Sequence, residues 1–187
     1  MTTPTATNRV RVREGDRPIP GTGFTLPVVL ILDNLRSAFN VGNILRLADA
    51  VRAREVLACG YTAAPPHPKL AKTARGCDRT VTVRRFPDAA AALRECRDRG
   101  FRIYGVETVE GARIYWETRF VFPAALIFGN EALGISPEAL ALCDASVSLP
   151  ALGIKNSINV ANCAAAVMFE ALRQRLEPEN AETPSRG

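Results

Sequence analysis

Three separate segments of the chain place polar side chains directly after a short apolar run. In the first, Leu32–Ala50, Asn40 and Gly42 stand where a helix is expected to begin, and Arg46 lies one helical turn and a little beyond Gly42. The free N–H groups of a helix N-terminus favour an anion, and Arg46 would point toward that anion from the same helix. The alternative is that Asn40 is only a helix cap and Arg46 a surface charge.

The second segment, Ala124–Ser136, leads from an apolar run into a turn that contains Gly129, Glu131 and Gly134. Glycines at the exit of a strand allow the backbone to approach a ligand closely. A glutamate in that turn could bond a hydroxyl or an amine. The alternative is a turn that uses its glycines for backbone geometry alone and leaves Glu131 in solvent.

The third segment, Ser148–Leu172, runs through a glycine-containing loop and enters an Ala-rich helix through Asn156, Ser157 and Asn159. An Ala-rich helix allows other backbone to approach it closely. The alternative is a core helix that Asn156 or Ser157 caps.

The elements that carry these segments alternate between strand and helix. Apolar and β-branched runs predict strands at Val28–Leu32, Glu55–Cys59, Thr80–Arg84, Arg102–Val106, Ala124–Phe128 and Ala145–Leu149. Helical spacing predicts helices at Val41–Val51, Leu70–Gly76, Asp88–Asp98, Pro137–Leu142 (capped by Ser136) and Ile158–Leu176. The sequence therefore predicts an α/β fold with a mostly parallel sheet and helices on both faces. The ligand site of such a sheet lies where loops leave the carboxyl ends of its strands.

Length and composition limit the number of domains, the location and the kind of partner that we expect for the protein. With 187 residues and 47% hydrophobic content, we expect one compact domain over residues 27–176, a flexible basic arm over 1–26 and a disordered tail over 177–187. The absence of a long apolar run and of a signal-like N-terminus predicts a soluble, cytoplasmic protein without a membrane segment. A net charge of +5 fits a polyanionic partner such as RNA, or simply a solvated basic surface.

Several kinds of catalytic site are disfavoured. The five cysteines are scattered without a C-x-x-C pair, and His67 is the single histidine, so neither a metal site nor Ser-His-Asp catalysis is expected. A Rossmann-like nucleotide enzyme is also disfavoured, because the chain lacks a G-x-G-x-x-G fingerprint and has Cys59 where an acidic residue would end the second strand.

The three segments, taken together and in this order, resemble the three motifs of the SpoU (TrmH-like) tRNA/rRNA methyltransferases of the SPOUT superfamily. The first motif resembles RSAFNVGNILRLADA, the second IFGNEALGIS and the third LPALGIKNSINVANCAAAV. The segment PPHPKLAKTARGCDRTV also resembles a linking segment of small members. The resemblance covers about residues 27–176, which is nearly everything outside the two tails.

This resemblance implies a trefoil knot in the C-terminal half and S-adenosylmethionine as the cofactor. The cofactor contacts that it implies are Thr108, Gly129, Leu149, Ile154 and Ser157. The catalytic residues that it implies are Asn40, Arg46, Glu131, Ser157 and Asn159. The reaction would be methyl transfer to a ribose 2′-hydroxyl, in which Arg46 engages the RNA phosphate and helps to remove the proton, because a free arginine is a poor base.

The resemblance also implies a homodimer, formed by the long last helix and the first motif, and no metal. The RNA is expected to be tRNA more than rRNA, because the chain is small; neither the RNA nor the nucleotide can be named from the sequence. The alternative function is a non-catalytic RNA-binding or assembly factor on the same fold. That alternative is disfavoured because the chain has Arg46, Glu131 and Asn159, which a protein without activity has no need to keep.

Overall fold

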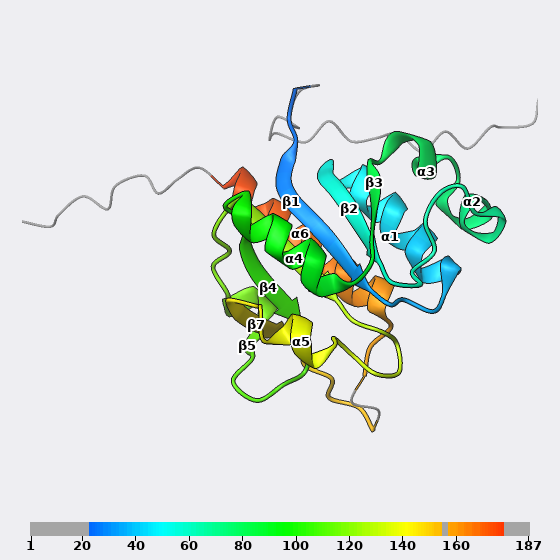
Figure 1. Ribbon diagram of the computed structural model, residues 1–187. Coiled ribbons are helices and arrows are strands. Elements are labelled where there is room, and N and C mark those ends of the chain that lie inside the picture. Colours follow the sequence, from blue (N-terminus) through cyan, green and yellow to red (C-terminus); the bar gives the residue numbers. More distant parts are fainter. Residues whose placement is uncertain (1–22, 155–156, 178–187) are drawn as a thin grey trace, which may run out of the picture.

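The computed structural model describes residues 23–154 and 157–177 (Figure 1). Within these residues, seven parallel strands form one sheet in the order β3-β2-β1-β6-β4-β7-β5. The strands are β1 (Leu26–Asp33), β2 (Ala53–Cys59), β3 (Val83–Phe86), β4 (Arg102–Val106), β5 (Arg113–Ile114), β6 (Ala124–Phe128) and β7 (Ala145–Ser148). Strand β1 lies inside the sheet between β2 and β6: β2 and β3 follow on one side of it, and β4 to β7 lie on the other side.

Helices cover both faces of this sheet. They are α1 (Ala38–Ala50), α2 (Pro68–Ala74), α3 (Cys77–Thr80), α4 (Ala89–Asp98), α5 (Pro137–Leu140) and α6 (Val160–Leu176), with a 3₁₀ turn η1 (Tyr115–Glu117). In Figure 1, α4 and α5 lie in front of the sheet, and α1 and α6 lie behind it. Alternate residues of β1 face the two layers: Leu30 and Leu32 pack with α1 and α6, whereas Val29 and Ile31 pack with α4. Because β1 is buried on both faces, it reads as one continuous apolar run.

The expected α/β fold with a mostly parallel sheet is therefore confirmed, and the trefoil knot stays a prediction. The predicted strand Thr80–Arg84 was wrong in position. Thr80 ends α3, where its hydroxyl donates to Asp49 at 2.7 Å, and β3 begins only at Val83. The short β5 and η1 were not predicted, because elements of two or three residues are too short to show a periodic pattern.

The capping of two helices, α5 and α6, also differs from the prediction. Ser136 precedes α5, but its hydroxyl makes no cap hydrogen bond and donates to Asp33 at 2.7 Å instead. The last helix begins at Val160 rather than at Ile158, because Asn159 is the cap: its side-chain oxygen accepts from the Ala161 amide at 2.9 Å. Both differences lie at the carboxyl edge of the sheet, where side chains also bond to other segments.

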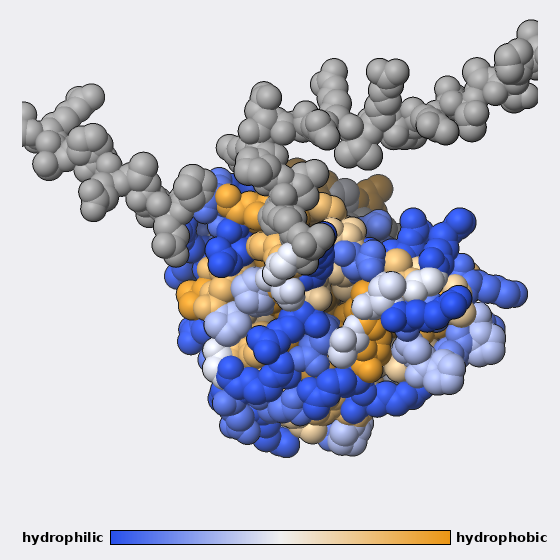
Figure 2. Space-filling model, turned by 90° about the horizontal axis from the view of Figure 1, so that it is seen from above, coloured by the Kyte–Doolittle hydropathy of each residue, from blue (hydrophilic) through white to orange (hydrophobic). Residues whose placement is uncertain are grey.

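Across residues 23–154 and 157–177, no helix is both long and apolar enough to cross a membrane, and no cluster of three or more His, Cys, Asp or Glu side chains could hold a metal ion. All five cysteines are free. Figure 2 views the amino-terminal edge of the strands, where hydrophobic patches lie between hydrophilic residues.

Candidate active site at the carboxyl edge of the sheet

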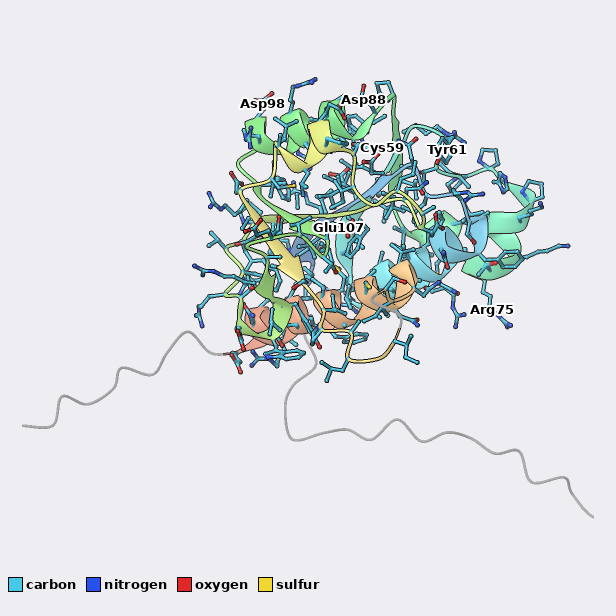
Figure 3. All side chains as sticks on the ribbon, turned by 90° about the horizontal axis from the view of Figure 1, so that it is seen from below. Cys59, Tyr61, Arg75, Asp88, Asp98 and Glu107 are labelled. Carbon is cyan, nitrogen blue, oxygen red and sulfur yellow. The ribbon has the colours of Figure 1, made fainter. Side chains whose placement is uncertain are left out.

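A pocket of about 430 Å³ opens at the carboxyl edge of the sheet, the edge that Figure 3 faces. It lies beyond the ends of β4, β6 and β7, and Glu107, labelled near the centre of Figure 3, belongs to its wall. The pocket is lined by Val106, Glu107, Thr108, Phe128, Gly129, Asn130, Glu131, Ala132, Gly134, Ser148, Leu149, Ala151, Ser157, Ile158, Asn159, Val160 and Cys163. Its volume falls within the range of roughly 300–1,000 Å³ that small-molecule sites have.

The turn that follows β6 forms one wall of the pocket. Asn130 and Gly134 exchange two backbone hydrogen bonds of 2.9 Å, and the Asn130 side-chain oxygen accepts from the Ala132 amide at 2.9 Å. Gly134 has a φ of 72°, a conformation that favours glycine. A Cβ on Gly129 would lie 2.1 Å from the Gly134 carbonyl carbon, so only glycine fits there. The turn therefore has little freedom to change shape.

Two carboxylates at strand ends hold this turn in place. Asp33, at the end of β1, accepts from the Ser136 amide at 2.9 Å. Glu107, just after β4, accepts from the Ile135 amide at 3.1 Å and from the Thr108 amide at 2.9 Å. Neither carboxylate was among the predicted site residues. The available signal was an acidic residue directly after an apolar strand, at the edge where the site was expected.

Glu131 binds the start of α1 from the tip of the turn. Its carboxylate accepts from the amides of Arg36 at 2.8 Å and Ser37 at 3.1 Å, and from the Asn40 side chain at 2.9 Å. Burial by itself would raise the pKa of Glu131, but these donors outweigh burial and lower the pKa below its usual value. Glu131 is therefore a fixed anion that orients α1, rather than a solvated charge.

Asn159 extends this network to the third segment. Its side-chain nitrogen donates to the Asn40 side-chain oxygen at 3.1 Å, while its oxygen caps α6. Glu131, Asn40 and Asn159 thus form one continuous chain of hydrogen bonds. The structure brings the three predicted segments together, and each contributes one member of this chain.

The residues predicted to bind the cofactor lie mostly in the same pocket. Thr108, Gly129, Leu149 and Ser157 line it, whereas Ile154 is not among its lining residues and is fully exposed. The pocket fits S-adenosylmethionine in chemistry as well as in size. Apolar side chains can cover a flat base, and exposed backbone at the close turn can bond its polar edges.

Arg46 lies apart from the other predicted catalytic residues. It is exposed on α1 and does not line the pocket. Its charge acts on Cys77 of α3, where it opposes the rise in the pKa of that thiol caused by burial and by Asp49. Six residues at about 100° each separate Arg46 from Asn40, so the two side chains leave α1 in different directions. The structure does not bring Arg46 to the pocket of its own chain.

The double role of Asn159 can be separated by one substitution. Asn159→Asp keeps a good helix cap, so we expect an unchanged melting temperature. It also replaces the side-chain nitrogen that donates to the Asn40 oxygen by a carboxylate oxygen, and these two oxygens repel each other. If the Asn40 amide rotated to donate to the new carboxylate, its oxygen would face the Glu131 carboxylate and be repelled there instead. For the methyl transfer that the resemblance implies, we expect the rate to fall about tenfold, the effect of losing one hydrogen bond. Asn162→Asp, on the exposed face of the same helix, is the control, and an equal loss there would contradict this role for the network.

Comparisons with known proteins agree with this site. The SpoU rRNA Methylase family matches residues 27–169. The tRNA (guanosine(18)-2′-O)-methyltransferase of Thermus thermophilus is 38% identical over 150 residues, which cover 80% of this chain and 76% of that protein. The 23S rRNA (uridine(2479)-2′-O)-methyltransferase of Streptomyces viridochromogenes is 33% identical and is covered over 55% of its length.

Solved structures show the same similarity. The SpoU methyltransferase AviRb from Streptomyces viridochromogenes, in complex with the cofactor AdoMet, superposes with a TM-score of 0.74 at 29% identity. That comparison covers 81% of this chain and 58% of AviRb, so the chain spans little more than half of that longer protein. Together with the family match over residues 27–169, these similarities show that the chain belongs to the SpoU rRNA methylase family.

Proposed function

We propose that this protein transfers a methyl group from S-adenosylmethionine to a ribose 2′-hydroxyl of RNA, with tRNA as the substrate in the cytoplasm. The observation that carries the proposal is the chain of hydrogen bonds from Glu131 through Asn40 to Asn159, which joins all three family motifs beside one pocket. Two similarities favour tRNA over rRNA. The Thermus relative is named as a tRNA enzyme, and a structure titled for methylation of C/U34 on tRNA is covered over 95% of its length.

The cofactor would lie in the pocket between the Gly129–Gly134 turn and the entry to α6. Thr108, Gly129, Leu149 and Ser157 would contact it, and Ile154 could do so only if its exposed loop moved inward. When bound, S-adenosylmethionine supplies an electrophilic methyl group on a sulfonium sulfur. The bonded turn restricts the pocket to one shape, which favours in-line positioning of the two reactants.

The residues of the chain would then prepare the ribose. A ribose hydroxyl is a very weak acid and needs help to lose its proton. Arg46 would hold the adjacent phosphate and stabilise the negative charge that develops on the oxygen. Asn40 and Asn159, each held by its neighbour in the hydrogen-bond chain, would orient the ribose, while Glu131 keeps α1 in place. Ser157, beside them, would contact the cofactor or the ribose.

We further propose that the active form is a homodimer. Arg46 lies outside the pocket of its own chain, so a second copy could supply it. Helix α6 has an exposed apolar face on which that copy could pack. Phe169 and Leu176, seven residues apart and therefore on one face of the helix, are 53% and 42% exposed. Ile158, 39% exposed before the same helix, extends this apolar face toward the pocket. A two-fold dimer would bury such a surface in both copies.

Methylation itself can be tested with S-adenosylmethionine that carries a labelled methyl group. Unmodified tRNA and rRNA transcripts are incubated with the protein and digested to nucleosides. The expected product is a 2′-O-methyl nucleoside from tRNA. Label on a base, or label in neither RNA, would contradict the proposal.

Mixing two inactive variants tests the shared site. If Arg46 acts across the dimer, a heterodimer of Arg46→Ala with Glu131→Ala has one site with both defects and one intact site. Random exchange of subunits makes about half of the dimers mixed, so about a quarter of the wild-type activity should return. If Arg46 acts within its own subunit, every site keeps one defect and the mixture stays inactive. Each variant alone is the control.

A further inference from the structure

A second pocket, of about 420 Å³, lies on the other side of the loop that leads into α1. It is lined by Arg36, Ser37, Ala38, Phe39, Tyr61, Thr62, Ala63, His67, Lys69 and Arg85. These residues come from the segments after β1 and β2, from the start of α2 and from β3. The pocket therefore shares the carboxyl edge of the sheet with the candidate active site.

The charge of this second pocket is positive. Arg36, Lys69 and Arg85 line it, none of the lining residues is acidic, and these three cations make no ion pair with the described part of the chain. Arg85 donates instead to the Ala64 carbonyl at 2.9 Å, which fixes its guanidinium. By contrast, the neighbouring Arg84 bonds Glu95 and Glu55. Unpaired cations gathered around one cavity suit a phosphate.

Two aromatic rings stand in the same pocket. Phe39 is 58% exposed and Tyr61 is 61% exposed, which is unusual for large rings that serve the core. Tyr61 is nevertheless held: its hydroxyl accepts from the Asn130 side chain at 2.6 Å, and its amide donates to the Asn34 side chain at 3.3 Å. Figure 3 shows Tyr61 to one side of Glu107, toward α1 and α2. A fixed, exposed ring is a platform on which a base can stack.

Asn130 links the second pocket to the first. It lines the candidate active site, and its side-chain nitrogen donates both to Tyr61 and to the Asn34 carbonyl, the latter at 2.7 Å. On the opposite side of the same loop, the amides of Arg36 and Ser37 hold Glu131. The wall between the two pockets is therefore one bonded unit, and a strand of RNA that entered one pocket would pass directly by the other.

We propose that the second pocket binds a nucleotide of the RNA next to the one that is methylated. Its base stacks on Tyr61 or Phe39, and its phosphate is held by Arg36, Lys69 and Arg85. Single-stranded RNA is read in this way, by aromatic stacking and cations along the backbone. The inference rests on the proposed function, because it assumes that RNA is the substrate of the adjacent site.

The test measures RNA binding without cofactor, so that it does not depend on methyl transfer. The probes are a short fluorescein-labelled oligouridylate and an unmodified tRNA transcript, followed by fluorescence anisotropy over a series of salt concentrations. Tyr61→Ala should weaken binding about tenfold, whereas Tyr61→Phe keeps the ring, loses only the bond from Asn130 and should weaken binding much less. Lys69→Ala should weaken binding and reduce the salt dependence by about one counterion. Lys72→Ala removes one charge from the same helix outside the pocket and should change binding less.

Each possible result either supports RNA binding in the second pocket or overturns it. Because Phe39 is exposed, Phe39→Ala is a second ring variant that should fold normally if Tyr61→Ala does not. Wild-type affinity in both ring variants overturns the inference, and so does equal weakening by Lys69→Ala and Lys72→Ala. Binding of free uridine 5′-monophosphate that depends on Tyr61, with RNA binding unchanged, also overturns it. Ring-dependent RNA binding in a protein that methylates nothing would instead reject the proposed function alone.

Discussion

Replacing Arg46 by alanine is expected to lower the rate of RNA methylation about 100- to 1000-fold, the effect of removing one group that stabilises transition-state charge. The loss should leave the fold and the cofactor site intact, because Arg46 is exposed and lies outside the cofactor pocket. The melting temperature and the affinity for S-adenosylmethionine should therefore stay close to those of the wild type. Single-turnover kinetics with saturating RNA, together with calorimetry for the cofactor, measure these quantities.

Two further variants make the Arg46 result specific. Arg46→Lys keeps the charge but loses the fork of donors that binds a phosphate in two places, so we expect only partial recovery of the rate. Arg94→Ala removes an exposed arginine from α4, on the opposite face of the sheet, and should leave the rate unchanged. A fully active Arg46→Ala protein would contradict the proposed mechanism even if the fold and the cofactor site are right.

Replacing Gly129 by alanine is expected to weaken S-adenosylmethionine binding by about 100-fold or more. The new Cβ would lie 2.1 Å from the Gly134 carbonyl carbon and 2.2 Å from the Ile135 amide nitrogen. Both are backbone atoms, and Glu107 holds the Ile135 amide in place, so the turn must open to relieve the contact. Opening it deforms the pocket wall directly. Isothermal titration calorimetry measures the affinity, and a lower melting temperature should accompany the loss.

Gly153→Ala is the matched control for this effect. Gly153 lies on the loop between β7 and α6, and a Cβ there would meet nothing within 4 Å. Gly153→Ala adds the same methyl group as Gly129→Ala, but without a steric contact. Unchanged cofactor affinity in Gly129→Ala, or an equal loss in Gly153→Ala, would show that the close turn does not shape the cofactor site.

The sequence predicted the central strands best, for a physical reason. β1 and β6 are buried on both faces, so every residue in them except Asp33 at the end of β1 is apolar and the pattern is unambiguous. β3 lies at the edge of the sheet and carries Arg84 and Arg85, and its alternating pattern continues into the preceding turn. The contact of Thr80 with Asp49, which places α3 before β3, joins residues far apart in sequence and leaves no local signal.

The same distinction holds for the candidate site. The three segments were each predicted to follow a strand, and parallel strands bring their carboxyl ends to one edge. In the structure Asn40, Glu131 and Asn159 of these segments are joined by hydrogen bonds, and their catalytic role stays a prediction. The direction of Arg46 depends on how α1 is rotated against its neighbours, which periodicity alone did not settle. The second pocket gathers residues from separate segments around an empty space, and no sequence motif records such a space.

The hydrogen-bond chain beside the pocket also bears on how the protein gains activity during folding. Its bonds join residues 91 and 119 positions apart, whereas helices and most neighbouring strands form through shorter separations; the pairing of β1 with β6 (Val28 with Ala124) is the comparably long one. Contacts that close such long loops carry the largest entropic cost, and we expect them to form late. Asn159 must be synthesised and docked before Asn40 and Glu131 have their third partner. A nascent chain can therefore build most of the sheet while it still lacks a site that could act on RNA.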